Sequence, residues 1–477
     1  MVMNTTAPDL DLEDFRNHIP TADQKGHRIW IYPRKPVGRF YRWRTWVAAL
    51  LLTILAVGPF IKIGGAPLLM MNIPARKFVL FGQIFWPQDF YIFALLLLTI
   101  FIMIVLFTAV FGRVWCGWLC PQTVFMELVF RKIEYWIEGD AHEQRALDKT
   151  PWTPSKIARK GLKHVLFFGL SFFVGNLLLA YIIGVDELWR IVSDDPRNHL
   201  AGLSAMIGFS LLFYGIFARF REQACTFICP YGRFQSVLLD NDSIVVAYDH
   251  RRGEPQQRFH RNQSYDARKA AGIGDCINCR LCVDVCPTGI DIRNGTQMEC
   301  VNCTACIDAC DGVMDRLAFP RGLIRYASQR NINEAKPFRV NPRMVLYSAL
   351  LLVLTGVLVV ILATRTNVET QLLRAPGTMF QELPNDEIGN LYLVKVVNKT
   401  LRDIPVELRI ESPPGARLQV AGGALVAPRE KLVQSAVVIS APRAAFQGGN
   451  LPLSIGVYEN GKLLRTLKSN LVGPSRQ

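Results

Sequence analysis

The most constraining part of this chain reads Cys276-Ile-Asn-Cys-Arg-Leu-Cys-Val-Asp-Val-Cys286-Pro287, followed by Cys300-Val-Asn-Cys-Thr-Ala-Cys-Ile-Asp-Ala-Cys310. Each run has the spacing Cys-x2-Cys-x2-Cys-x3-Cys, which is the ligand spacing of bacterial proteins that hold two iron–sulfur clusters. In such proteins the fourth cysteine of each run binds the cluster of the other run. We therefore predict two [4Fe-4S] clusters, with cluster one on Cys276, Cys279, Cys282 and Cys310, and cluster two on Cys300, Cys303, Cys306 and Cys286.

Zinc is the competing interpretation of these eight cysteines, because zinc sites also use Cys-x2-Cys pairs. Two runs of four cysteines in this rhythm are more typical of iron–sulfur proteins. The second run departs from the pattern in one respect, since Cys310 is followed by Asp311 and not by proline. The departure removes no ligand, but it changes the environment expected for the cluster that Cys310 binds.

The other four of the twelve cysteines form two copies of Cys-x3-Cys-Pro, one at Cys116 and Cys120, the other at Cys225 and Cys229. Proline suits the first position of a helix, so the second cysteine of each copy is expected at a helix N-terminus, where the dipole lowers a thiol pKa. Such thiols suit Cu(I), zinc or another iron–sulfur centre. The alternative is that they pack as small buried hydrophobes.

The two Cys-x3-Cys-Pro copies belong to an internal repeat. A shift of 109 residues superposes Cys116 on Cys225 and Cys120 on Cys229, together with the flanking proline and phenylalanines. Each copy follows an apolar segment, and a helix is predicted for Gln122–Glu138 after the first. The repeat predicts that the four thiols lie near each other.

Five long uncharged segments are predicted to cross a membrane, because a span takes roughly 20 apolar residues. They are Thr45–Ile61, Phe90–Phe111, Val165–Val185, Leu200–Ala218 and Met344–Thr364. Half of the 477 residues are hydrophobic, so the net charge of +15 indicates membrane topology and not a nucleic-acid partner.

Lys and Arg concentrate before the first segment and between the second and third, which is typical of cytoplasmic loops. We therefore expect a multi-pass protein of a bacterial inner membrane, with its N-terminus cytoplasmic and its C-terminus periplasmic. All twelve cysteines then face a compartment that keeps thiols reduced, which favours metal binding over disulfides. The first 40 residues lack the apolar core of a signal peptide, so a cytoplasmic tail is expected.

After the fifth segment, short alternating stretches are separated by Pro, Gly and Asn, which predicts strands of a β-sandwich. They are Leu391–Val397, Ile404–Ile410, Ala416–Val420, Lys431–Ile439 and Leu453–Tyr458. Asn460-Gly461 predicts a type I′ hairpin turn. This part contains no cysteine and is expected to serve in interaction or as a scaffold.

The predicted fold class is a polytopic α-helical membrane protein with five spans, a two-cluster ferredoxin-like α+β insert and a C-terminal all-β immunoglobulin-like sandwich. The predicted domains are a basic tail at 1–44, a four-span membrane domain at 45–239, the two-cluster domain at 240–343, the fifth span at 344–364 and a periplasmic immunoglobulin-like domain at 365–477.

This combination resembles the cbb3-type cytochrome oxidase accessory proteins, called CcoG, FixG or RdxA. The resemblance rests on the spans that end in Trp115-Cys-Gly-Trp-Leu-Cys-Pro121 and Ala224-Cys-Thr-Phe-Ile-Cys-Pro230, the two-cluster block, the fifth span and the sandwich. It implies an iron–sulfur protein that reduces Cu(II) to Cu(I) for assembly of a copper-containing oxidase, with copper chemistry at Cys116, Cys120, Cys225 and Cys229.

The partners implied are the membrane, copper ions, an oxidase assembly factor or copper transporter or chaperone, and an electron donor that the sequence does not identify. A homodimer is one option. Two other functions use the same residues. One is a relay that takes electrons from quinol to a periplasmic reductase, and the other is a copper-holding scaffold without catalysis.

Overall fold

The computed structural model describes residues 20–22, 25, 27–73, 77–80, 82–260, 263–335, 340–366, 368–377, 379–384, 386–400, 402–429, 431–446 and 448–474. Residues 1–19, 23, 24 and 26 of the predicted cytoplasmic tail therefore lie outside the described residues. The chain divides into two compact units. Unit 1 comprises Met1–Val57, Leu95–Leu179 and Trp189–Val357, and unit 2 comprises Gly58–Ala94, Ala180–Leu188 and Leu358–Gln477.

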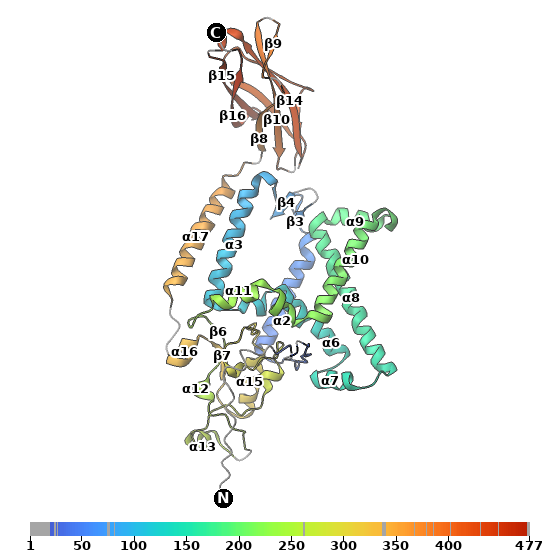
Figure 1. Ribbon diagram of the computed structural model, residues 1–477, viewed down its shortest axis with the longest axis vertical. Helices are drawn as coiled ribbons and strands as arrows, with labels where there is room; N and C mark the ends of the chain where they lie inside the picture. Colours follow the sequence, from blue (N-terminus) through green and yellow to red (C-terminus); the bar gives the residue numbers. More distant parts are fainter. Residues whose placement is uncertain are drawn as a thin grey trace. The chain divides into compact units, whose positions relative to one another are not determined.

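Among the described residues, five helices are long and apolar enough to cross a membrane, as the sequence predicts (Figure 1). They are α2 (Arg39–Val57), α3 (Phe90–Phe111), α8 (Pro154–Ile183), α10 (Leu200–Gly215) with its π-helical extension η5 (Ile216–Phe220), and α17 (Pro342–Ala363). The bounds of α3 match the prediction. By contrast, α8 begins at Pro154 and not at Val165, because its first turns are basic and find acidic partners.

The link from α3 to α8 is a series of short helical segments joined by turns. It consists of α4 (Val114–Trp118), α5 (Pro121–Phe125), η3 (Met126–Phe130), α6 (Arg131–Ile137) and α7 (Ala141–Lys149). The helix predicted for Gln122–Glu138 is confirmed as the run from α5 to α6, with Phe125 and Leu128 buried. After η5 come η6 (Ala224–Ile228) and α11 (Pro230–Leu238).

The two cysteine runs lie between two paired strands. β6 (Val245–Tyr248) pairs antiparallel with β7 (Ile324–Ala327). Between these strands are α12 (His250–Gly253), α13 (Tyr265–Ala270), α14 (Leu281–Asp284), η7 (Ile292–Asn294) and α15 (Ala305–Arg316), and α16 (Gln329–Glu334) follows them. β6 lies in the core, because its four residues are buried.

Unit 2 contains short elements that the sequence analysis missed. After η1 (Gly58–Phe60), β1 (Lys62–Ile63) pairs with β2 (Ala66–Pro67), and β3 (Leu69–Asn72), β4 (Lys77–Leu80) and β5 (Gln83–Phe85) form a small sheet. η2 (Pro87–Asp89) precedes α3. The amphipathic helix α9 (Val185–Ser193) and η4 (Pro196–His199) connect α8 to α10.

The C-terminal part is the predicted β-sandwich. Its strands are β8 (Val368–Arg374), β9 (Gln381–Leu383), β10 (Glu387–Asn398), β11 (Ile404–Ser412), β12 (Arg417–Val420), β13 (Leu425–Ala427), β14 (Leu432–Pro442), β15 (Asn450–Glu459) and β16 (Lys462–Val472). One sheet has the order β12-β14-β10-β8 with β9 beside β10, and the other has the order β13-β11-β15-β16. Asn460 and Gly461 both have positive φ, which confirms the predicted hairpin turn.

Candidate functional site

The eight cysteines of the two runs line two cavities in unit 1. The first cavity contains Cys276, Cys279, Cys282 and Cys310 among apolar side chains from Leu281 to Ile324. The second contains Cys286, Cys300, Cys303 and Cys306, and Cys282 reaches its edge. The fourth cysteine of each run thus lies with the first three of the other run, which is the grouping that the spacing predicts.

The two runs share an unusual backbone conformation. The residues on either side of the second cysteine have left-handed φ values: 54° at Asn278 and 59° at Arg280, then 53° at Asn302 and 64° at Thr304. Non-glycine residues rarely adopt this region, and it has a cost that the surrounding structure must offset. The two reversals turn three successive thiols toward one cavity, and the same device occurs twice.

The donor set of the cavities fits iron–sulfur clusters. Burial raises the pKa of the Cys282 and Cys300 thiols to about 12 and that of Cys303 to about 11. Such thiols stay protonated at neutral pH unless a bound metal compensates the thiolate charge. In the described part of the chain, no three His, Cys, Asp or Glu side chains converge on one ion position. Thiols spread over the walls of a cavity suit the corners of a cluster better than a lone zinc ion.

The four remaining thiols gather at the ends of the two repeated spans, as the repeat predicts. Beyond the effect of burial, the charges of Cys120 and Cys229 raise the pKa of Cys116. The charges of Cys120, Cys116 and Cys229 likewise raise the pKa of Cys225. Mutual effects of this kind require short separations, because charge interactions weaken with distance.

The helix start predicted after each copy is present. Cys120 is the N-cap of α5 and Cys229 is the N-cap of α11, each followed by proline at the first helical position. Burial raises the pKa of Cys116 and Cys225, the first cysteines of the two copies, to about 12, because desolvation disfavours the thiolate.

The first copy is packed against the loop of the second cysteine run. A Cβ atom added at Gly117 would lie 2.8 Å from the carbonyl oxygen of Asn302 and still closer to that of Val301. The buried Arg44 side chain donates from Nε to the Gly117 carbonyl at 3.0 Å. Arg113 donates to the carbonyl oxygens of Met298 and Gly232, so it ties the second run to both copies.

Cys116 is the closest link between the two groups of thiols. It packs in one apolar cluster with Cys303, Cys306 and Val301. Its thiol donates to Gln235 Oε1 at 3.2 Å. The second cavity and the four repeated thiols are therefore joined through side chains in van der Waals contact.

The second copy has a charged environment. Cys225 lines a small cavity with Glu127, Arg221, Glu222 and Thr288. Thr288 also lies 3.3 Å from the Cys286 sulfur through its hydroxyl. This cavity therefore connects Cys225 to the loop that follows the first cysteine run.

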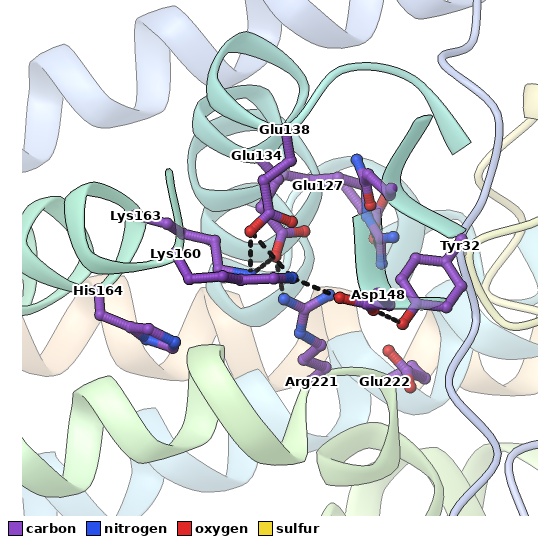
Figure 2. Close-up of polar contacts among 12 residues, drawn as sticks. Tyr32, Glu127, Glu134, Glu138, Asp148, Lys160, Lys163, His164, Arg221 and Glu222 are labelled. Atoms are coloured by element: carbon purple, nitrogen blue, oxygen red, sulfur yellow. Dashed lines mark hydrogen bonds and ion pairs between the residues drawn. The ribbon is translucent and has the colours of Figure 1, made fainter. Parts of the chain in front are cut away.

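Arg221, which lines this cavity, also belongs to a buried ionic network (Figure 2). Arg221 pairs with Glu134, and Lys163 lies 3.5 Å from Glu134 and 2.9 Å from Glu138. Lys160 bridges Glu138 at 3.1 Å and Asp148 at 2.7 Å. Burial alone would raise the pKa of Glu134, but Arg221, Lys163 and Arg131 outweigh burial and hold the pKa below its usual value.

Sequence analysis did not identify this network or the arginines beside the cavities. The network joins residues far apart in the chain, such as Glu134 and Arg221, and no spacing rule connects them. The one available signal was three lysines just before the predicted span Val165–Val185, at Lys156, Lys160 and Lys163, which need partners if the membrane helix extends over them.

Three family models match the chain. A 4Fe-4S dicluster domain matches residues 220–329, a 4Fe-4S binding domain matches residues 93–139, and the IG-like fold at the C-terminus of FixG matches residues 358–474. The chain is similar to the nitrogen fixation protein FixG of Rhizobium meliloti, with 32% identity over 439 residues, 83% of this chain and 81% of the relative. It is also similar to the protein RdxA of Cereibacter sphaeroides, with 34% identity over 414 residues, 83% of this chain and 85% of the relative.

Proposed function

This chain belongs to the FixG and RdxA family of membrane-bound iron–sulfur electron-transfer proteins, and from this premise we propose that it reduces Cu(II) to Cu(I) for assembly of a cbb3-type cytochrome oxidase. Cluster one is assigned to Cys276, Cys279, Cys282 and Cys310, and cluster two to Cys300, Cys303, Cys306 and Cys286. The copper substrate is assigned to Cys116, Cys120, Cys225 and Cys229.

The observation that carries this proposal is the position of Cys116. It packs against the apolar cluster of Val285, Val301, Cys303 and Ala305, and its pKa responds to Cys120 and Cys229. A copper ion held by thiols of this set would lie within a few side chains of the second cavity. Soft thiolate ligands favour Cu(I) over Cu(II), so the site itself promotes reduction.

The reaction balances with one electron. When bound, the clusters supply single electrons, and each one delivered converts Cu(II) to Cu(I). A soluble one-electron carrier must restore that electron at the exposed Cys279 end of the first cavity. The buried thiols of Cys116 and Cys225 release their protons as copper binds, because metal ligation requires the thiolate.

The proposal places the protein in a bacterial inner membrane. Lys and Arg are abundant before α2 and between α3 and α8, which supports a cytoplasmic N-terminus and a periplasmic sandwich. With that orientation, all twelve thiols lie at the cytoplasmic end of the spans.

The test uses the full chain purified without oxygen. Cu(II) reduction is followed as absorbance of a Cu(I)-specific chelator, and the clusters are followed by visible absorbance and iron content. The double variant Cys120→Ser and Cys229→Ser should retain the cluster absorbance and lose copper reduction. Thr226→Ser lies within the second copy, keeps the hydroxyl and removes a methyl group. It is the matched control and should keep both the cluster absorbance and copper reduction. Unchanged turnover in the double variant rejects the copper site.

Iron content and electron source separate the alternatives. Two clusters correspond to about eight irons per chain, whereas about twelve would place a third cluster on the repeated thiols. Reduction of the clusters by quinol analogues indicates a relay from the quinol pool. Tight Cu(I) binding without turnover indicates a copper-holding scaffold.

A further inference from the structure

An open groove of about 660 Å³ lies between the first turns of α2 and helix α6, in unit 1. Its volume is within the roughly 300–1,000 Å³ of small-molecule sites. Three cationic side chains line it, together with two tryptophans, two tyrosines and a threonine. These residues are Lys35, Tyr41, Arg42, Thr45, Trp46, Lys132, Tyr135 and Trp136.

The two helices present the same chemical pattern to the groove. On α2, Arg42, Thr45 and Trp46 follow the spacing i, i+3, i+4. On α6, Lys132, Tyr135 and Trp136 follow it again. Residues at this spacing share one face of a helix. A cation, a hydroxyl group and an indole therefore line the groove from each side.

The described residues that line the groove carry positive charge and include no carboxylate. Asp140 lies nearby, but its Oδ1 accepts hydrogen bonds from the backbone amides of Lys35 and Ala141. Burial, and after it the Lys35 ammonium, lowers the pKa of Lys132, as expected where cations face each other without a carboxylate between them.

The groove lies at the level where a membrane surface is expected. Arg42, Thr45 and Trp46 belong to the first turns of the candidate span Arg39–Phe60. The side chains of Trp46 and Trp136 are 72% and 76% exposed in the protein alone. Tryptophan is enriched at membrane interfaces, where its ring lies among the lipid headgroups. Basic pockets beside spans at this level suit anionic headgroups.

We propose that this groove binds the phosphate group of an anionic phospholipid. The three cations supply donors for the phosphate oxygens, and the two tryptophans border the acyl chains. The Thr45 and Tyr135 hydroxyls line the groove but donate to the carbonyl oxygens of Tyr41 and Pro33. The shared chemistry is a phosphate anion. The apolar border favours a lipid over free inorganic phosphate as its source.

Native mass spectrometry of the full chain in detergent tests this, with phosphatidylglycerol, phosphatidylcholine and inorganic phosphate added in separate arms. Phosphatidylglycerol should be retained in preference to both other additions. The double variant Arg42→Gln and Lys132→Gln should bind it roughly 30-fold more weakly, from about 1 kcal/mol per cation. Lys149→Gln with Arg159→Gln removes two exposed cations outside the groove and should bind it as the unchanged chain does.

Cluster absorbance of each variant shows that it has folded. An equal loss of lipid in the groove and control variants would assign binding to general surface charge and overturn the proposal. Equal retention of phosphatidylcholine, or retention of inorganic phosphate alone, would overturn the lipid assignment. If Arg42→Gln with Lys132→Gln does not fold, Arg42→Lys with Lys132→Arg should keep the lipid preference.

Discussion

The two Cys-x3-Cys-Pro copies have the same backbone plan and opposite surroundings. In the first copy, Gly112 reverses the chain after α3 with a φ of 57°, and at the equivalent position after η5 Arg221 does so with a φ of 52°. The first copy then has Gly117 where the second has Thr226. Both glycines of the first copy lie against backbone of the cluster region, at Ile244, Val301 and Asn302.

The charges of the two copies differ in the same way. Arg113 of the first copy reaches the backbone near Cys300, whereas its equivalent in the second, Glu222, pairs with Arg28 at 2.9 Å. The first copy therefore packs closely on the backbone of the second cysteine run, whereas the second copy contributes side chains to buried ion pairs.

The largest effect is expected from making the first copy resemble the second. Gly117→Thr places a side chain against the carbonyl oxygens of Val301 and Asn302, which cannot move without shifting the cysteine loop. We expect loss of cluster two and about half of the iron and acid-labile sulfide. The reciprocal Thr226→Gly is the control and should keep full iron content. Full iron in Gly117→Thr would show that the loop does not depend on this contact.

Next in size is the loss of the buried charge in the network of the second copy. Glu134→Gln leaves Arg221 without its carboxylate partner and Lys163 with Glu138 alone, and breaking a buried pair costs about 3–5 kcal/mol. Thermal unfolding, followed by loss of cluster absorbance, should occur at a clearly lower temperature. Glu143→Gln on the exposed side of α7 should change it little.

The same carboxylate predicts an acid limit to stability. The pKa of Glu134 is lower in the folded protein than in the unfolded chain, where it is about 4.3. Its stabilisation is therefore complete above about pH 4.3 and is lost as the pH falls through the folded-state pKa. Unfolding temperatures measured from about pH 5 down to about pH 3 should fall more steeply for the unchanged chain than for Glu134→Gln. Parallel curves would contradict the assignment.

A smaller effect is expected on electron affinity. The Arg113 cation opposes the burial-induced rise in the pKa of Cys300, so it also stabilises added electrons nearby. Arg113→Gln should lower the reduction potential of cluster two by tens of millivolts, on the order of 1 kcal/mol of charge interaction. Glu222→Gln, the equivalent change in the second copy, should shift it less. EPR-monitored redox titration separates the two clusters.

The smallest effect concerns the start of the first span. Asp308 of α15 accepts hydrogen bonds from the backbone amides of Phe40 at 3.0 Å and Tyr41 at 2.7 Å. Asp308→Ala should cost about 1 kcal/mol, as loss of a helix cap does. Asp266→Ala in α13 removes an exposed acid from the same region and should be neutral. Equal unfolding temperatures for the two variants would show that this cap contributes nothing.

The helices α3 and α8 differ in how well the sequence predicts where they begin and end. The bounds of α3 were predictable because 22 uncharged residues leave a helix no reason to end within the apolar layer. The start of α8 was not predictable, because Lys156, Lys160 and Lys163 enter the helix only when backbone carbonyls and distant carboxylates receive them. Patterns within one segment identify elements, whereas partners between segments set where charged elements begin.

In the candidate site, too, patterns within one segment were predictable and contacts between segments were not. Cysteine spacing predicted which thiols share each cavity, since short loops restrict where neighbouring thiols can point. The helix N-terminus rule gave the right caps at Cys120 and Cys229. It made no statement about Cys116 and Cys225, whose pKa burial raises, because burial depends on what the rest of the chain places over them. The motif alone gives no reason for a glycine at position 117. The reason is the backbone of Val301, which packs against it.

The contact between Asp308 and the start of α2 has a consequence for biogenesis. The amides of Phe40 and Tyr41 and the carboxylate that receives them are separated by 268 and 267 positions. Translation proceeds from the N-terminus, so the ribosome completes the first four spans before the capping residue exists. The first helix must enter the bilayer with these amides unsatisfied and acquires its cap only after the cysteine block has been synthesised. The cap of the first span therefore forms only after the first four spans have been made.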